Sequence, residues 1–302
     1  MTATLRLGTR GSMLARLQSQ QTADLIEKAN PDCVVELVIV KTTGDQVQDR
    51  PLADLGGKGL FTKEIEQALL RGDIDLAVHS YKDVPVTMPL VDASDLIIAA
   101  VPAREDARDV LVAAEGMTLD TLPQGARVGT GSLRRRTQLL AARGDLQVLG
   151  LRGNIDSRLS RQRSGEYDAI VLAMAGLRRG GLYDGATMTA LPPEIVTPAA
   201  GQGALAVQCR ADHAAARAAV APLHDADTAR CVDAERAVVL AMNADCHSPI
   251  GVYATLAGGE MSLMAVYTAG NGPPHRASAT GPDAVRRVSR QLSRLRPSFG
   301  GG

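Results

Sequence analysis

Short apolar runs alternate with longer amphipathic stretches along the N-terminal third of the chain. Runs bounded by turn residues are typical of buried strands, and apolar residues at helical spacing are typical of helices that cover a sheet. We expect strands at 5–9, 34–42, 74–78 and 96–101, and helices at about 13–28 and 60–71. This order predicts a parallel sheet with helices on its faces.

The same pattern restarts after a charged stretch at 102–109, which we interpret as a crossing between domains. We expect strands at 126–130, 146–151 and 168–173, with helices at 132–143 and 154–163 between them. A proline-rich loop at 192–198 is interpreted as the return crossing, and an alternating strand follows at 203–210. The pattern predicts a second α/β unit of similar plan.

The C-terminal part changes to helices at about 212–221 and 228–242, strands at 250–258 and 260–270, and a last helix near 283–295. This order is typical of a small α+β domain. The predicted fold class is therefore α/β, with two doubly wound domains and a small α+β C-terminal domain. The predicted boundaries are 1–101 with 199–221 for domain 1, 106–194 for domain 2 and 224–302 for domain 3.

Polar side chains are concentrated where the strand at 74–78 ends. His79, Ser80, Lys82 and Asp83 follow one another there, before Pro85 prevents a regular continuation. In open α/β sheets, ligands bind at the carboxyl ends of the strands. A capped turn with a solvated Lys and Asp explains this stretch equally well, so its pattern alone leaves both interpretations open.

The sequence GTGSLRRR (129–136) follows a strand directly and opens a helix. Free backbone N–H groups and the hydroxyls of Thr130 and Ser132 would form a cradle for a carboxylate or a phosphate. The spacing of a P-loop is absent. Arg134, Arg135 and Arg152 would add charge-assisted donors to this cradle.

A second strand end, LRGN (151–154), repeats the arrangement, with Arg158 one turn further on. Arg10 and Lys58 of the first unit would extend the anion site across a cleft. Arginine on a helix is most often solvated, and we assign that role to the remaining arginines of this region. These are Arg136, Arg143, Arg161 and Arg163.

The net charge is zero, with 33 basic and 33 acidic residues, but the basic residues are unevenly placed. Nine arginines lie between positions 127 and 163, where there are only two acidic residues. A neutral protein with one strongly positive region favours a focused anion site over a surface for a long polyanion. Aromatic residues make up only 2%, which disfavours base stacking and therefore a single-stranded nucleic-acid binder.

The four cysteines, at 33, 209, 231 and 246, show no metal-site spacing and are interpreted as reduced thiols of a cytosolic protein. Cys246 stands in the polar loop ADCHSP, whereas the others lie in or beside apolar runs, so Cys246 is the predicted accessible thiol. The adjacent His247 suggests a Cys/His hydrolase, but no oxyanion-hole signature accompanies the pair. No uncharged apolar run reaches about 18 residues, so no membrane span is expected.

Eight stretches occur in an order that resembles the porphobilinogen deaminase (hydroxymethylbilane synthase) family over about residues 5–267. They are TRGS (9–12), GGKGLF (56–61), HSYKDVPV (79–86), GTGSLRRR (129–136), LRGN (151–154), YDAIVLAMAGLRR (167–179), PAAGQGALAVQCR (198–210) and DCHSPIG (245–251). The resemblance implies three domains, the first two like periplasmic binding proteins, with the active cleft between them.

The resemblance also implies a transferase of tetrapyrrole (haem) biosynthesis. Such an enzyme joins four porphobilinogen molecules head to tail, releases ammonia and yields linear hydroxymethylbilane. A dipyrromethane cofactor, attached through a thioether to a cysteine that matches Cys246, primes the chain, and no metal is implied. Asp83 matches the catalytic aspartate, which would stabilise an azafulvenium cation and help to move protons.

Each pyrrole carries acetate and propionate groups, which suits the arginine-rich turns. The family's anion-binding positions match Arg10, Ser12, Gln18, Lys58, Ser80, Lys82, Thr130, Ser132, Arg134, Arg135, Arg152, Arg158 and Arg179. Two departures stand out: Gly131 replaces a frequent Ser, and Ala244-Asp245 precedes Cys246 where many members have glycines. The Asp245 carboxylate disfavours thiolate formation, so slower cofactor loading is expected.

We therefore predict a cytoplasmic, monomeric enzyme that acts on the small molecule porphobilinogen, with neither a nucleic-acid nor a membrane partner. The main alternative is a non-catalytic anion-binding module of the periplasmic-binding-protein type. That module would keep the arginine-rich cleft but would need neither Cys246 nor Asp83.

Overall fold

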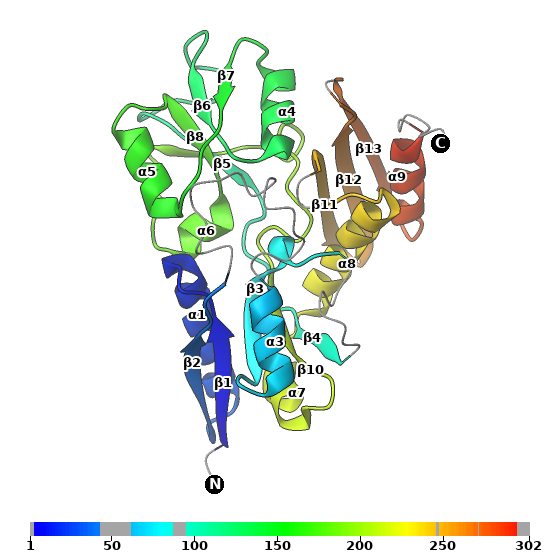
Figure 1. Ribbon diagram of the computed structural model, residues 1–302. Coiled ribbons are helices and arrows are strands. Elements are labelled where there is room, and N and C mark those ends of the chain that lie inside the picture. Colours follow the sequence, from blue (N-terminus) through cyan, green and yellow to red (C-terminus); the bar gives the residue numbers. More distant parts are fainter. Residues whose placement is uncertain (1–2, 43–61, 87–94, 246–247, 271, 295–302) are drawn as a thin grey trace, which may run out of the picture. The chain divides into compact units, whose positions relative to one another are not determined.

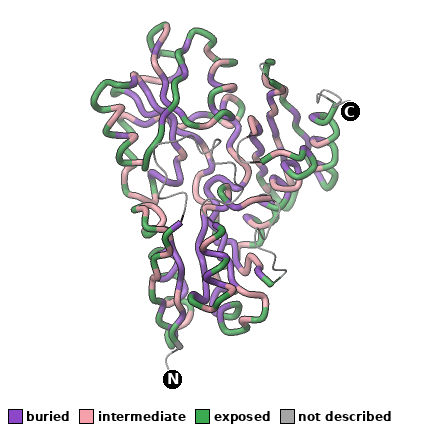
Figure 2. Tube along the Cα trace, viewed as in Figure 1, coloured by how far each residue is buried: buried purple, intermediate pink, exposed green. Residues whose placement is uncertain are grey.

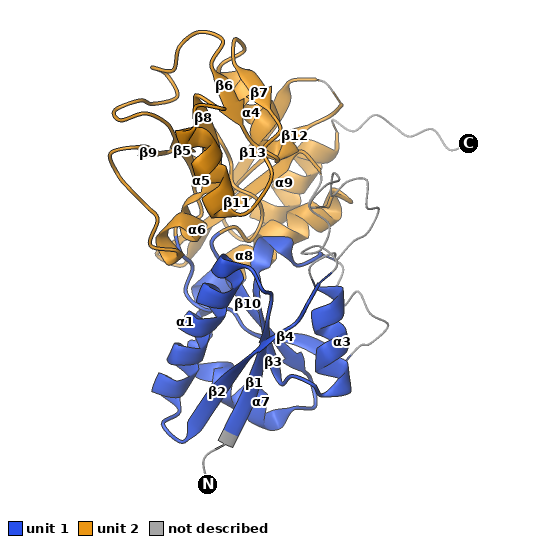
Figure 3. Ribbon diagram, turned by 60° about the vertical axis from the view of Figure 1, so that its left-hand side comes forward, with its two compact units in different colours: residues 1–105, 203–229 blue, residues 106–202, 230–302 orange. Residues whose placement is uncertain are grey.

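A computed structural model of the 302-residue chain describes all residues except 1–2, 43–61, 87–94, 246–247, 271 and 295–302. The chain divides into two compact units, which Figure 3 distinguishes by colour. Unit 1 comprises Met1–Glu105 and Gly203–Ala229, and unit 2 comprises Asp106–Gln202 and Arg230–Gly302. The finer division into three domains, with the boundaries given above, stays a prediction.

Unit 1 contains a five-stranded sheet in the order β2-β1-β3-β10-β4. Its strands are β1 (Ala3–Thr9), β2 (Cys33–Ile39), β3 (Leu76–Ser80), β4 (Leu96–Ala100) and β10 (Leu205–Arg210). Strand β1 pairs in parallel with β2 and β3, and β10 runs antiparallel between β3 and β4. The three parallel strands therefore present their carboxyl ends at one edge of the sheet.

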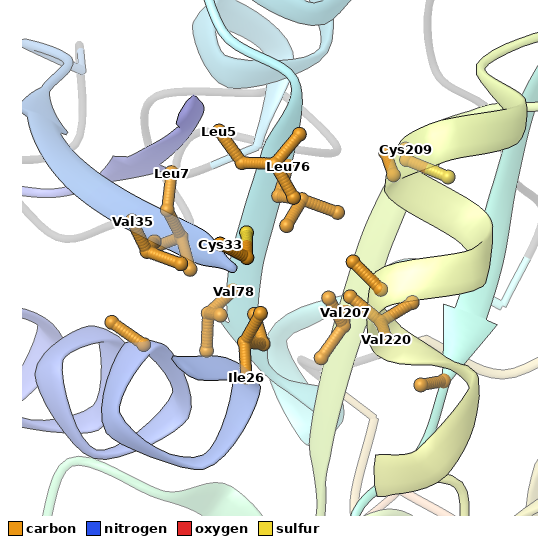
Figure 4. Packing of buried hydrophobic residues seen from close by; sticks show 14 of the residues in the cluster. Leu5, Leu7, Ile26, Cys33, Val35, Leu76, Val78, Val207, Cys209 and Val220 are labelled. Atoms are coloured by element: carbon orange, nitrogen blue, oxygen red, sulfur yellow. The ribbon is translucent and has the colours of Figure 1, made fainter. Parts of the chain in front are cut away.

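Helices cover both faces of this sheet because successive strand residues point to opposite sides. On one face, Leu7, Leu76 and Val207 pack with Ile26 of α1 (Met13–Ala29) and with α7 (Ala214–Val220), as Figure 4 shows. On the other face, Ala77 packs against α3 (Lys63–Arg71). Two 3-10 turns, η2 (Tyr81–Asp83) and η3 (Ala221–Leu223), complete the described elements of unit 1.

Unit 2 repeats this plan in a sheet of order β7-β6-β8-β5-β9. Its strands are β5 (Asp109–Val112), β6 (Arg127–Gly129), β7 (Gln147–Leu149), β8 (Ala169–Ala173) and β9 (Met188–Ala190). Strand β6 is parallel to β7 and β8, and β5 is antiparallel to β8 and β9. Helix α4 (Leu133–Ala142) packs on one face, and α5 (Ile155–Arg163) and α6 (Met174–Arg179) pack on the other.

A smaller antiparallel sheet, β11-β12-β13, follows in the C-terminal part of unit 2 (Figure 1). It consists of β11 (Ile250–Ala257), β12 (Glu260–Thr268) and β13 (Pro274–Thr280). Helix α8 (Ala226–Ala241) precedes it, and α9 (Ala284–Ser293) buries Ala284, Val288 and Leu292. Figure 2 shows that the central strands β3, β8 and β10 are buried almost throughout.

The predicted fold class, two doubly wound α/β sheets and a small α+β part, is confirmed by these sheets. The charged stretch at 102–109 was expected only as a crossing, but its last residue, Asp109, begins the buried strand β5. Strand β13 was not expected, because its inward positions hold the small residues Ala277 and Ala279 and its outward positions are polar. The expected start of a helix at residue 60 lies outside the described residues.

Candidate active site

The carboxyl edge of the unit 1 sheet collects the predicted site residues of that unit. Arg10 follows β1, and Ser80, Lys82 and Asp83 end or follow β3. Because β1 and β3 are parallel neighbours, with Gly8 paired to Ala77, these residues emerge at the same edge. The structure thus brings together polar groups that are about 70 positions apart in the sequence.

Helix α1 contributes two further predicted site residues, Ser12 and Gln18, at this edge of the sheet. The Ser12 hydroxyl caps α1 by accepting a hydrogen bond from the Ala15 N–H at 3.3 Å. One turn further on, the buried Gln18 side chain hydrogen-bonds the Ser80 hydroxyl, also at 3.3 Å. Helix α1 therefore fixes the end of β3 from one face of the sheet.

The polar stretch after β3 forms the single 3-10 turn η2. The Tyr81 N–H donates to the Ala204 carbonyl at 3.0 Å, and the Val84 N–H donates to the Tyr81 carbonyl at 3.2 Å. Tyr81 and Val84 are buried, Lys82 is partly exposed and Asp83 is exposed. The turn consequently anchors its two apolar residues and presents the Asp83 carboxylate to solvent.

His79 is not presented at this edge with its polar neighbours. It is only 6% exposed, and its Nε2 lies 2.9 Å from Oε1 of Gln208 on β10. Burial lowers the pKa of His79 to about 4, so the imidazole is neutral at physiological pH. The sequence pattern grouped His79 with Ser80, but strand alternation sends these two side chains to opposite faces.

Unit 2 has a cavity of about 490 Å³ at the carboxyl edge of its sheet. Its lining residues are Thr130, Gly131, Ser132, Leu133, Arg136, Gly150, Leu151, Arg152 and Arg161. The cavity combines the N-terminus of α4, the loop after β7 and three guanidinium groups. Free N–H groups of a helix start and arginine side chains both favour a bound anion.

The start of α4 is arranged as the sequence predicted. Ser132 caps the helix by accepting from the Arg135 N–H at 3.4 Å, and the Thr130 hydroxyl accepts from the Ser132 N–H at 3.2 Å. At Gly131, a Cβ atom would lie 2.7 Å from the Leu151 carbonyl oxygen. The absence of a side chain at 131 therefore lets the two cavity-lining loops approach each other closely.

Arg134 and Arg135 point away from this cavity into a buried network. Both are almost fully buried, and both bind Asp109, which is 0% exposed. Arg134 Nη1 donates to Asp109 Oδ2 at 2.7 Å and to the Thr197 carbonyl at 2.6 Å. Arg135 donates to Asp109 Oδ1 from Nε at 3.0 Å and from Nη2 at 2.7 Å.

Asp109 is the centre of this network and is ionised. Burial raises its pKa, but the charges of Arg134 and Arg135 outweigh burial and hold the pKa well below its usual range. Gln202 adds a third donor, from Nε2 to Asp109 Oδ1 at 2.8 Å. Among the described residues, Arg134 Nε is buried without a hydrogen-bond partner.

The other predicted arginines of unit 2 are more accessible. Arg152 is exposed and lines the cavity, whereas Arg158 and Arg179 are half-buried. Arg158 donates from Nε to the Gly153 carbonyl at 2.7 Å, which holds the loop after β7 against α5.

Two arginines that were assigned to solvated helix faces also line the cavity, namely Arg136 and Arg161. Arg161 is held by Glu166 and by the Tyr167 hydroxyl, to which its Nη2 donates at 2.9 Å. The sequence contained one signal that Arg136 lies at the cavity, namely its position in the first turn of α4. It contained no signal that Arg161 lies there.

Two predicted site residues, Lys58 and Cys246, lie outside the described residues. Among the described cysteines, Cys33, Cys209 and Cys231 are buried. Burial raises the pKa of the Cys209 thiol to about 11 and also raises that of Cys33, which leaves both thiols protonated and unreactive. Within the described ranges, no group of acidic, histidine and cysteine side chains could hold a metal ion. None of the described helices is long and apolar enough to cross a membrane.

Fold and site together define an α/β protein with an arginine-lined cavity that suits a small anionic ligand. The model of the family domain "Porphobilinogen deaminase, dipyromethane cofactor binding domain" matches residues 5–218, and that of "Porphobilinogen deaminase, C-terminal domain" matches residues 229–287. The chain belongs to the porphobilinogen deaminase family.

Proteins named porphobilinogen deaminase are similar to this chain over most of its length. The porphobilinogen deaminase of Syntrophobacter fumaroxidans is 46% identical over 290 residues, covering 95% of this chain and 92% of that protein. The porphobilinogen deaminase of a Roseiflexus species is 47% identical over 272 residues, covering 90% of this chain and 88% of that protein. The predictions of the family, of a transferase and of a dipyrromethane cofactor are confirmed.

A solved structure with a similar arrangement is the substrate-binding domain of a putative molybdenum ABC transporter from Clostridium difficile. The two are 12% identical, with a TM-score of 0.46, over 77% of this chain and 96% of that domain. Such a likeness supports no statement about ligand or activity.

The residues of unit 2 fit the dipyrromethane group. Its two pyrrole rings carry acetate and propionate carboxylates, and the cavity offers cationic side chains and free N–H groups to receive them.

Proposed function

We propose that this chain is a hydroxymethylbilane synthase that joins four porphobilinogen molecules head to tail and releases one ammonia per molecule. The dipyrromethane cofactor supplies a terminal pyrrole carbon as the nucleophile that starts the chain. The observation that carries the proposal is the cavity of unit 2, where α4 begins and where Arg136, Arg152 and Arg161 converge. Its donors match a ligand that bears several carboxylates.

Asp83 is the proposed catalytic residue. Loss of ammonia from porphobilinogen leaves an azafulvenium cation whose charge is shared with the ring nitrogen. An exposed carboxylate held on the short turn η2 can accept a hydrogen bond from that N–H and stabilise the cation. The same carboxylate can take up and return a proton at the reacting pyrrole.

The remaining site residues are proposed to bind the carboxylates of cofactor and substrate. They are Arg10, Ser12, Gln18, Lys58, Ser80 and Lys82 of the first unit, and Thr130, Ser132, Arg134, Arg135, Arg152, Arg158 and Arg179 of the second. For Arg134 and Arg135, we propose that the ligand carboxylates are bound by guanidinium N–H groups that do not donate to Asp109. Cys246 is the proposed attachment point of the cofactor, through a thioether.

We further propose the cellular setting that the sequence indicates. The protein would act as a cytoplasmic monomer with three domains, on a small-molecule substrate, without a nucleic-acid or membrane partner. Zero net charge and the scarcity of aromatic side chains support the absence of a nucleic-acid partner.

Intact mass spectrometry of the purified protein tests this function. We expect a mass above that of the sequence by one dipyrromethane, and we expect the excess to disappear in Cys246→Ala. Cys231→Ala, which changes a buried thiol, is the matched control and should keep the added mass. An unmodified wild-type protein without activity on porphobilinogen would instead support a non-catalytic anion-binding module.

A further inference from the structure

Three polar side chains are connected in series inside the α3 face of the unit 1 sheet. His79 on β3 is 6% exposed, and Gln208 on β10 and Glu66 on α3 are both 0% exposed. His79 Nε2 lies 2.9 Å from Gln208 Oε1, and Gln208 Nε2 donates to Glu66 Oε1 at 3.3 Å. Buried polar groups are costly unless they are hydrogen-bonded, so a chain of three directly behind the Asp83 turn calls for an explanation.

The direction of this chain follows from what each group can donate. The NH₂ group of the Gln208 amide donates to Glu66, and an amide oxygen can only accept. The amide oxygen must then face His79, and His79 Nε2 must carry the proton. Glu66 thereby selects one tautomer of an imidazole that it does not touch. Burial, which lowers the pKa of His79 to about 4, keeps that imidazole neutral.

The C-terminal end of β3 is held on both faces of the sheet, and the His79–Gln208–Glu66 series holds one of them. On the α1 face, Gln18 binds Ser80. On the α3 face, the next residue back along β3, His79, is held through Gln208. Asp83 follows only three residues after Ser80, across the short turn η2. Only the turn η2 thus separates the Asp83 carboxylate from the strand end that is held on both faces.

We propose that Glu66 and Gln208 are positioning residues: they fix His79 as the Nε2–H tautomer and thereby hold the end of β3 so that the Asp83 carboxylate is correctly placed. The inference rests on the proposed function, because it assigns these residues to the reaction of Asp83. Small displacements of a catalytic group cost up to about a hundredfold in rate. None of these three residues lines the anion cavity of unit 2.

The tautomer is measured first, by ¹⁵N NMR of the wild-type holoenzyme with labelled histidine. We expect His79 to show a protonated Nε2 and an unprotonated Nδ1 at neutral pH. An Nδ1–H tautomer or an imidazolium at His79 would overturn the proposal, and this measurement needs no variant.

The second measurement uses Glu66→Gln, which keeps the shape but can present either an oxygen or an NH₂ group to Gln208. We expect both His79 tautomers in the spectrum and a kcat about tenfold below wild type, with KM within about twofold and the cofactor mass unchanged. Gln208→Met, which removes the bridge at similar volume, should lower kcat to a similar extent. Wild-type kcat in a folded Glu66→Gln or Gln208→Met protein would overturn the positioning role.

Asp75→Asn is the matched control for a mere loss of stability in the same sheet. Asp75 lies just before β3, at the opposite end from Asp83, and accepts three hydrogen bonds from Arg6 at 2.8 to 3.0 Å. This variant should unfold at lower denaturant concentration yet keep wild-type kcat. A wild-type protein without turnover would overturn the proposed function and the role given to Asp83. The tautomer measurement would still test the direction of the hydrogen bonds between His79, Gln208 and Glu66.

Discussion

Asp109 and Arg134 form a buried ion pair in which Arg134 Nη1 lies 2.7 Å from Asp109 Oδ2, with side-chain exposures of 0% and 5%. Arg135 binds the other oxygen of the same carboxylate. One buried anion thus pairs with two successive arginines of the SLRRR motif, and α4 is tied to the first residue of β5.

We expect Asp109→Asn to unfold unit 2 easily. The substitution leaves two buried guanidinium groups without a counter-charge, and breaking a buried pair in this way costs about 3 to 5 kcal/mol. Urea unfolding followed by circular dichroism measures the loss. Asp145→Asn removes the partner of Arg143 at the surface and should leave the midpoint close to wild type. Equal urea midpoints in both variants would show that the buried ion pair stabilises the protein no more than the surface pair does.

Asp83→Asn should abolish turnover while the protein still carries its cofactor. The amide is isosteric but neutral, so the cation formed on loss of ammonia loses its counter-charge. Removing one such electrostatic partner typically costs about a hundred- to a thousandfold in kcat. Steady-state kinetics on protein of verified mass measure the effect. Asp73→Asn changes an exposed carboxylate before β3 and should retain wild-type kcat.

Gly131→Ala should distort the cavity of unit 2. The new methyl group would lie 2.7 Å from the Leu151 carbonyl oxygen, so the two lining loops must separate. Overpacking of this kind costs about 1 to 3 kcal/mol, and we expect both a lower thermal midpoint and a raised KM for porphobilinogen. At Gly150, in the same lining, a Cβ would meet no atom within 4 Å. Gly150→Ala should therefore behave as wild type, and similar losses in both variants would contradict the steric explanation.

His79 should make unit 1 less stable in weak acid. Its pKa is about 4 in the folded protein, against an ordinary value of about 6.5, so between these values the unfolded chain binds the extra proton. Stability is then fully present above about pH 6.5 and falls as the pH approaches 4, by roughly 3 kcal/mol for this group.

The neutral variant His79→Gln lacks this proton uptake. The difference in unfolding free energy between wild type and His79→Gln should therefore shrink as the pH is lowered from 7 to 4.5, which denaturant titrations at several pH values would measure. A difference that stays constant across this range would mean that His79 titrates normally.

Most of the fold could be predicted because its strands are continuous apolar runs. The apolar runs that form β3, β8 and β10 are buried on both faces, which makes them easy to recognise. Strand β5 was missed because it has four residues and begins with a carboxylate. Only the two arginines that neutralise Asp109 make a strand start at that residue possible, and they lie 25 and 26 positions away.

The positions of site residues at strand ends could be predicted from the sequence. The contacts of the buried polar residues could not. Ser12, Ser132 and Asp83 lie where local patterns placed them, because caps and turns are short-range features. The partners of Arg134 and His79 depend on strands that are distant in sequence. Hydrophobic periodicity carries no information about such pairs, so it could not show that these two side chains are turned inward.

The antiparallel strand β10 makes unit 1 a discontinuous unit. It lies between β3 and β4 in the sheet, yet its residues are synthesised only after residues 106–202. Until then β3 and β4 lack their common neighbour, and His79 lacks Gln208. The turn that bears Asp83 therefore acquires its support late in biosynthesis, after the sequence of the unit 2 cavity is complete. Assembly of the anion cavity can precede assembly of the turn that bears Asp83.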